Sequence, residues 1–144
     1  MALIVQKYGG TSVKGPERVK NVARRVVDTY REGNQVIVVV SAPGGMTDEL
    51  IALAGQISPN PPAREMDMLL TTGEQTSIAL LAMAINDLGV PVISLTGPQV
   101  GILTDNIYSR ARILEVKHER LHKELGQNKI IIVAGFQGET REGE

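Results

Sequence analysis

The sequence contains no cysteine and no tryptophan, and only three tyrosines and one phenylalanine among its 144 residues. Without cysteine, disulfides and thiolate metal sites are excluded, and the composition agrees with a reducing, cytoplasmic location. So few aromatic residues argue against a stacking platform for single-stranded nucleic acid. A formal net charge of −1 gives no electrostatic reason to expect nucleic acid or an anionic membrane surface as a partner. We expect neither a secretion signal nor a membrane span, because the N-terminus lacks a charged segment followed by an apolar one and the apolar runs are short.

Apolar runs of strand length alternate with helical patterns along the chain. Strands are predicted at residues 2–8, 36–40, 91–95 and 130–134. The β-branched run at 36–40 is typical of a parallel strand that is buried on both faces. Helices are predicted at residues 16–32, 48–57, 63–70, 74–88 and 117–125. The segments 63–70 and 74–88 form either a pair of helices or one bent helix. This order predicts the α/β class, with a mainly parallel sheet that helices cover on both faces.

The first candidate site follows the first predicted strand. Ligands of parallel α/β sheets bind at the carboxyl ends of the strands, and Lys7-Tyr8-Gly9-Gly10 lies there. The two glycines let the backbone approach a phosphate, successive N–H groups form an anion-binding nest, and Lys7 adds a positive charge. The segment is neither a Walker A loop nor Gly-x-Gly-x-x-Gly. A plain glycine turn beside a solvated lysine fits the local pattern equally well.

Two further candidates also fall at strand-to-helix junctions or helix starts. Ser41 opens a glycine-rich segment that leads to Thr47, and such junctions offer helix N-terminal amides to an anion. Spacing alone favours Thr47 as an N-cap. Glu74 follows Thr71-Thr72-Gly73, and its carboxylate suits an ammonium ligand. From the residues alone a capping box is the favoured interpretation, because Thr71 and Glu74 have the required spacing, as do Thr72 and Gln75.

A remote alternative is a zinc peptidase. His118-Glu119-Arg120-Leu121-His122 matches the H-E-x-x-H pattern, which places two histidines on one helix face with the glutamate as general base. The surrounding lysines and arginine indicate a solvated helix, and no later histidine is present to act as a third ligand. The competing interpretation is a surface helix with charge pairing.

Five segments together resemble the aspartate kinases, which are members of the amino-acid kinase family. The matches run in order along nearly the whole chain. They are Lys7-Tyr-Gly-Gly-Thr-Ser12, Val40-Ser-Ala42 with Thr47-Asp48, Arg64-Glu-Met-Asp-Met-Leu-Leu-Thr-Thr-Gly-Glu74, Leu95-Thr-Gly97, and Val133-Ala-Gly-Phe-Gln-Gly138. The resemblance implies a three-layer αβα sandwich. It also implies that residues 1–144 are the N-terminal, amino-acid-substrate-binding part of the kinase domain.

The resemblance implies transfer of the γ-phosphoryl group of ATP to the side-chain carboxylate of L-aspartate. This is the first step in the biosynthesis of lysine, threonine and methionine. Lys7 is implied as the catalytic residue that neutralises charge on the phosphoryl group, and Thr47 and Glu74 as aspartate ligands, with Glu74 on the α-ammonium. Mg²⁺ would be carried by the nucleotide, and no protein metal ligand is implied. The residues implied to bind ATP and its phosphates are Lys7, Tyr8, Gly9, Gly10 and Ser41.

The sequence departs from the family pattern in what it does not contain. Relatives continue past Gly138 into a Gly-Arg-Gly-Gly-Ser-Asp loop, a nucleotide-binding half and regulatory ACT domains. We therefore expect the 144 residues alone to be inactive and to self-associate through an exposed sheet edge, and the parent enzyme to be a homo-oligomer or to have a partner subunit. Pro43 also stands where many relatives carry methionine. The alternatives are a kinase for glutamate or acetylglutamate, and a non-catalytic amino-acid-binding or assembly module.

Overall fold

A parallel sheet forms the centre of the computed structural model, which describes residues 1–144. It has four strands in the order β1-β2-β6-β3. Ile4 of β1 pairs with Val36 of β2, and Ile37 of β2 pairs with Ile131 of β6. The predicted parallel sheet is confirmed, and each strand lies within about a residue of its predicted position. The strands are β1 (Leu3–Tyr8), β2 (Gln35–Val40), β3 (Val92–Leu95) and β6 (Ile130–Ala134).

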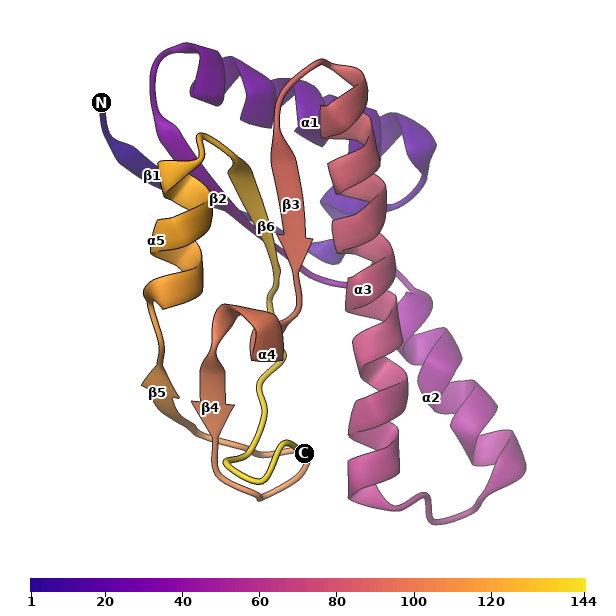
Figure 1. The fold of residues 1–144 in the computed structure, drawn as a ribbon. Coiled ribbons are helices and arrows are strands. Elements are labelled where there is room, and N and C mark those ends of the chain that lie inside the picture. The colour runs from indigo at the N-terminus through magenta and orange to yellow at the C-terminus, as the bar shows by residue number, and fades with distance from the viewer.

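Helices cover both faces of this sheet, as Figure 1 shows. On one face α1 (Pro16–Arg31) and α3 (Ala63–Asp87) pack on β2 and β6, and on the other α5 (Glu119–Gly126) and the short α4 (Gly97–Val100) pack on β3 and β6. Successive residues of a strand point to opposite faces, so every residue of β6 is buried, with Ile132 against α1 and α3 and Ile131 against α5. The predicted αβα sandwich is therefore confirmed.

Helix α1 follows its sequence signals closely. Pro16 occupies the first turn after Gly15, and Gly33, just past the last turn, has a φ of +95°, as expected for a C′ glycine. The predicted apolar stripe is the buried face, consisting of Val19, Val22, Ala23, Val26 and Val27.

Helix α3 runs unbroken through residues 63–87, where the sequence allowed either two helices or one bent helix. The predicted capping boxes are wrong, because the hydroxyls of Thr71 and Thr72 donate to the carbonyls of Met68 and Leu69 inside the helix. Gly73 serves close packing here, since a Cβ at this position would lie 2.9 Å from the Cβ of Ala42. Glu74 is therefore an interior helix residue, and its carboxylate faces the segment after β6.

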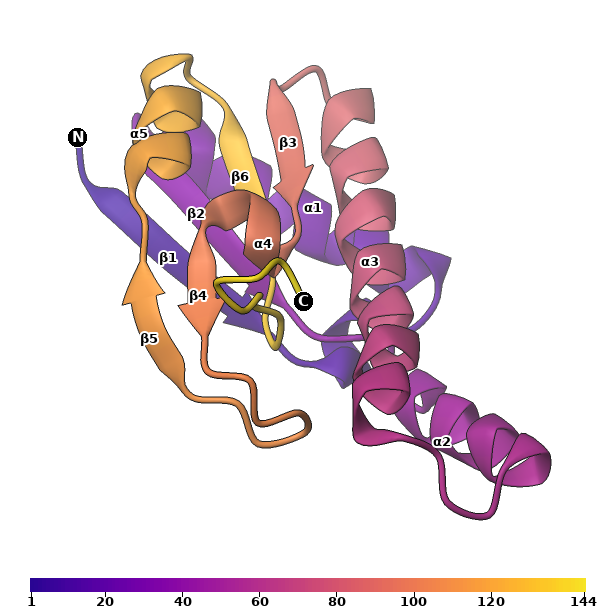
Figure 2. The same ribbon diagram turned by 60° about the horizontal axis from the view of Figure 1, so that its bottom comes forward.

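Helix α2 (Met46–Ile57) and the first half of α3 form a hairpin that extends beyond the sheet (Figures 1 and 2). No residue of α2 is buried. By length and composition alone α3 is long and apolar enough to cross a membrane. Its inner face nevertheless packs in the core through Ile78, Leu81 and Ile85, and it also carries the buried Glu74, so we describe it as a core helix.

Four short elements were not predicted from the sequence, and one of them is α4. A 3₁₀ helix, η1 (Gly10–Val13), follows β1. An antiparallel hairpin of β4 (Ile102–Thr104) and β5 (Ile113–Val116) lies apart from the main sheet. Its strands are three and four residues long, and all of β5 is exposed, so neither gives a clear apolar pattern.

Candidate functional site

A cleft of about 970 Å³ lies at the carboxyl ends of the parallel strands. Its walls come from the loop after β2, the start of α2, the inner side of α3, the β4–β5 connection and the segment that follows β6. The predicted site residues that line it are Gly10, Ser41, Thr47 and Glu74. Lys7, Tyr8 and Gly9 are not among the lining residues.

Glu74 is the buried charge of the cleft, with 5% of its surface exposed. Its Oε2 accepts a hydrogen bond of 2.8 Å from the backbone N–H of Phe136, in the segment after β6. Burial raises the pKa of the Glu74 carboxyl, and hydrogen bonds from Phe136, Gly135 and Gln137 only partly oppose this effect. A desolvated carboxylate that has no cationic partner in the protein is suited to bind an ammonium group.

Two glycine-rich loops meet at the end of β1. The N–H of Gly44 donates to the carbonyl of Gly10 at 2.8 Å, and a Cβ on Gly10 would lie 2.6 Å from the carbonyl oxygen of Ala42. Only glycine permits this approach. The N–H groups of Gly9 and Gly10 donate to no other group of the protein, so they are available to an anion.

Thr47 lies in the first turn of α2 and not at its N-cap. That position belongs to Gly45, which has a φ of +86°, and no side chain caps the helix. The predicted N-cap role of Thr47 is therefore wrong. Thr47 is exposed and lines the cleft.

Lys7 and Tyr8 point to opposite faces of the sheet, as neighbouring strand residues must. Lys7 is exposed, and its Nζ lies 5.8 Å from the ring centroid of Phe136, which lines the cleft. The Tyr8 hydroxyl instead donates to Gln6 at 3.2 Å, and burial raises its pKa. The side chain of Tyr8 packs against the core on the α1 side, and only its carbonyl, which accepts the N–H of Ser41 at 3.2 Å, is directed to the site loops.

A polar stripe along α3 was not recognised as such in the sequence. Arg64, Asp67, Thr71 and Glu74 all line the cleft, and their spacing of three or four residues places them on one helix face. Asp67 accepts hydrogen bonds from the N–H of Ser109 at 2.7 Å and from its hydroxyl at 3.4 Å, which ties α3 to the β4–β5 connection. This spacing is visible in the sequence and could have identified the stripe.

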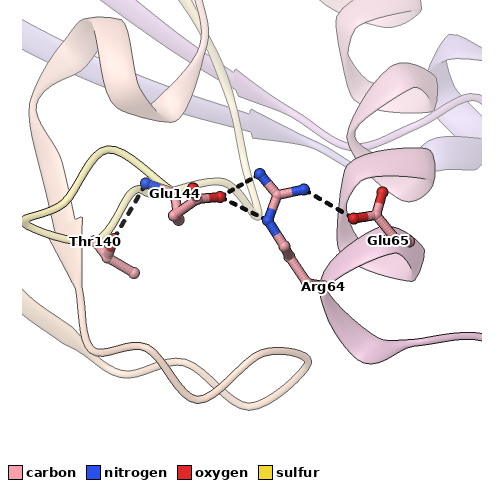
Figure 3. A network of polar contacts seen from close by, with 4 residues as sticks. All are labelled: Arg64, Glu65, Thr140 and Glu144. Carbon is pink, nitrogen blue, oxygen red and sulfur yellow. Dashed lines mark hydrogen bonds and ion pairs between the residues drawn. The ribbon is translucent and has the colours of Figure 1, made fainter.

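Arg64 links α3 to the last residues of the chain, and both Arg64 and Glu144 line the cleft (Figure 3). Its Nε donates to Glu144 at 2.6 Å, and its Nη1 lies 2.9 Å from Glu65. The backbone N–H of Glu144 donates to the hydroxyl of Thr140 at 3.1 Å. The hydrogen bond to Glu144 is the main cause that raises the pKa of Arg64. These are exposed ion pairs, which contribute little to stability.

The histidines of the H-E-x-x-H match lie on the exposed side of α5. Their ring centroids are 6.2 Å apart, and His118, Glu119 and His122 are all exposed. Within residues 1–144, no group of three or more His, Asp or Glu side chains is placed to share a metal ion. The zinc-peptidase alternative therefore gains no support.

A model of the amino acid kinase family matches residues 2–144, and the chain belongs to this family. Among curated proteins it is 58% identical over 144 residues to an aspartokinase of Bacillus sp. (strain MGA3), covering 100% of this chain and 35% of the relative. It is 55% identical over 142 residues to the aspartokinase of Corynebacterium glutamicum, covering 99% and 34%. The chain thus spans about a third of the length of these relatives, and the predicted resemblance is confirmed.

Solved structures give the same fold. Aspartate kinase from Synechocystis superimposes with a TM-score of 0.81 at 54% identity, covering 94% of this chain and 22% of that one. E. coli aspartokinase III in complex with aspartate and ADP gives a TM-score of 0.84, covering 100% and 42% of the two chains. At 21% identity the second structure supports the fold only.

Proposed function

We propose that this chain is the aspartate-binding part of an aspartate kinase, which transfers the γ-phosphoryl group of ATP to the side-chain carboxylate of L-aspartate. The observation that carries the proposal is Glu74, a buried carboxylate without a cationic partner, in a cleft at the carboxyl ends of parallel strands. The identity of 58% to an aspartokinase supports the choice of aspartate over glutamate or acetylglutamate as the substrate.

Glu74 is proposed to pair with the α-ammonium group of aspartate. The desolvation that raises its pKa also strengthens its attraction for a cation, because screening by water is reduced in a buried site. Thr47 supplies a hydroxyl from the neighbouring wall of the cleft, where it would bind the same substrate. A bound ammonium group would in turn favour the ionised form of Glu74.

The glycine loops and Lys7 are proposed to hold the phosphates. The free N–H groups of Gly9 and Gly10 suit phosphate oxygens, and Lys7 would neutralise charge on the group in transfer. Ser41, on the adjacent loop, would lie near the transfer centre, with Tyr8 holding its backbone in place. The acceptor carboxylate is already ionised, so the reaction needs no general base.

Mg²⁺ is proposed to reach the site on the nucleotide. The protein offers no group of three carboxylates or histidines that could hold the ion by itself, and Mg²⁺ commonly binds through substrate phosphates. The metal would add positive charge beside the transferred group, and the residues named above would orient the two substrates.

Because the chain spans about 35% of its relatives' length, the 144 residues alone are expected not to turn over ATP. The proposal extends to residues 1–144 as the N-terminal, substrate-binding part of a larger enzyme. It also extends to a homo-oligomer or partner subunit in that enzyme, a cytoplasmic location and a role in making lysine, threonine and methionine.

The test is a coupled assay of aspartate-dependent ADP release by the natural polypeptide that contains this sequence. Intact-mass spectrometry gives the length of that polypeptide. Glu74→Gln should lower kcat/KM for aspartate by about a hundredfold or more, because the ammonium ligand loses its counter-charge. Glu49→Gln, an exposed carboxylate on α2, is the control and should be silent. Aspartate binding by calorimetry without any ATP turnover would instead favour an amino-acid-binding module. Faster turnover of glutamate or acetylglutamate than of aspartate would show that aspartate is not the preferred substrate.

A further inference from the structure

The side chain of Gln137 joins three segments beside the cleft. It follows β6 and is buried, with 9% of its surface exposed. Its Nε2 donates to the carbonyl of Thr71 on α3 at 3.1 Å, and its Oε1 accepts the N–H of Gly97 at the start of α4 at 3.3 Å. One neutral amide therefore ties α3 and α4 to the segment after β6.

The position of Gln137 is fixed by close packing against α4. A Cβ on Gly97 would lie 2.1 Å from the carbonyl oxygen of Gln137 and 2.7 Å from its Cβ, so the two backbones touch. The start of α4 is itself held by a capping box, in which the Thr96 hydroxyl accepts the N–H of Gln99 and the Gln99 side chain accepts the N–H of Thr96. Gln137 thus reaches α3 from a rigid support.

The part of α3 that Gln137 contacts is the turn that carries Glu74. Thr71 precedes Glu74 by three residues, on the same helix face. The N–H of Phe136, the residue next to Gln137, donates to the Glu74 carboxylate at 2.8 Å, and the nearby Gln137 side chain opposes the rise in the Glu74 pKa that burial causes. An amide suits this place because Nε2 donates to the Thr71 carbonyl while Oε1 accepts the N–H of Gly97.

We propose that Gln137 is the positioning residue for Glu74, and that it sets the affinity of the cleft for the α-ammonium group of the amino-acid substrate. This inference rests on the proposed function. Gln137 acts through Glu74: its amide fixes the turn of α3 beneath the carboxylate and stabilises the ionised form that an ammonium group requires. A ligand that is held in one orientation by its neighbours loses less freedom on binding, which raises affinity.

Two substitutions separate positioning from folding. Gln137→Met keeps the side-chain length and loses every hydrogen bond, whereas Gln137→Glu keeps the shape and places a second negative charge beside Glu74. Each should raise the KM for aspartate by about tenfold or more and change the KM for ATP by less than about twofold. The matched control is Gln99→Glu, which keeps the capping box of α4 and lies outside the cleft lining.

The pH profile gives a readout that a purely structural role would not change. Since Glu74 must be ionised to bind ammonium, kcat/KM for aspartate falls as pH falls through its pKa, and both variants should shift this acidic limb to higher pH. None of the other charged side chains in the cleft hydrogen-bonds to Glu74, and all are retained in the variants. These side chains are Arg64, Asp67, Asp105, Arg110, Glu139 and Glu144.

An NMR titration of the Glu74 carboxyl carbon, assigned with Glu74→Gln, tests the inference without any assay of activity. In Gln137→Met this carboxyl should titrate at higher pH than in the unmodified protein. An enzyme without aspartate kinase activity would refute the proposed function, and the titration would still decide the role of Gln137. The inference is overturned if the variants lower only thermal stability and leave the aspartate KM, the acidic limb and the Glu74 titration unchanged. Equal increases in both KM values would also overturn it.

Discussion

Glu74 is a carboxylate that the fold buries without a counter-charge. Burial raises its pKa, so the folded state binds a proton more tightly than the unfolded chain does. As pH falls through the folded pKa towards the unfolded value of about 4.5, the Glu74 carboxyl takes up a proton and the protein becomes more stable. The destabilisation caused by the charged Glu74 carboxylate is fully present at neutral and alkaline pH. A buried charge kept at this expense is typical of a functional site.

Replacing Glu74 by glutamine should therefore stabilise the protein while it removes aspartate binding. Glutamine has the same shape, carries no charge and still accepts the N–H of Phe136. We expect a gain of about 0.5–2 kcal/mol at about pH 8 that shrinks towards about pH 5, measured by urea unfolding. Glu49→Gln, exposed on α2, should show no such trend. A Glu74→Gln variant that is less stable at pH 8 would contradict the argument.

Single residues of the site were predictable to different degrees. Gly10 and Ser41 could be named because strand ends and family motifs coincide at them, whereas Thr47 and Glu74 were named from the family motifs, and all four line the cleft. Spacing alone gave the wrong local role to Thr47, since the left-handed Gly45 takes the N-cap. The role of Gln137 could not be read from its neighbours in sequence, because its partners lie 40 and 66 positions away.

Among the elements, α5 is anchored by two ion pairs of the buried Glu124 carboxylate and not by its histidines. Glu124 is 3% exposed and accepts Lys129 Nζ at 2.8 Å and Arg120 Nε at 3.0 Å. The hydrogen bond from Lys129 is the main cause that lowers the pKa of Glu124, and that from Arg120 acts the same way. Its contribution to stability is present above the unfolded pKa and is lost as pH falls through the lowered folded pKa.

We expect Glu124→Gln to destabilise the protein by about 1–3 kcal/mol at neutral pH, because two charged donors lose their ionised acceptor. The loss should diminish under acidic conditions, in which the wild-type carboxyl also becomes neutral. Denaturant unfolding at several pH values measures both effects. Glu119→Gln, exposed on the same helix, is the control and should change stability by less than about 0.5 kcal/mol. Equal effects of the two substitutions would count against the ion pairs of Glu124.

The elements themselves were predicted in proportion to their length and burial. The runs that became β2 and β6 are continuous and β-branched because both of their faces are covered. The division of α3 at Gly73 was a real ambiguity, since the same glycine serves a helix end or a close contact, and only the neighbouring Ala42 decides between them. The β4–β5 hairpin depends on contacts that three- and four-residue strands do not reveal.

At the scale of the whole molecule, the sheet is open along β1. This strand is an edge of the sheet, and its residues on the α5 side are solvent-exposed, with Leu3 53% and Val5 61% accessible. Helix α5 packs over β6 and β3 and leaves these side chains uncovered. An edge with unpaired backbone groups beside apolar side chains is a site for pairing with another chain.

The 144-residue chain should therefore self-associate in a concentration-dependent manner, which light scattering coupled to size exclusion would measure. Val5→Lys should reduce this association strongly, because a lysine on the exposed face of an edge strand opposes strand pairing and removes apolar surface. Ile57→Lys is the matched control. The side chain of Ile57 is more exposed than that of Val5, at 82%, but Ile57 is the last residue of α2, in the helical hairpin that extends away from β1. If Ile57→Lys dissociates the assembly and Val5→Lys does not, the contact lies on the helical hairpin. A monodisperse monomer of the unmodified chain would contradict association through either surface.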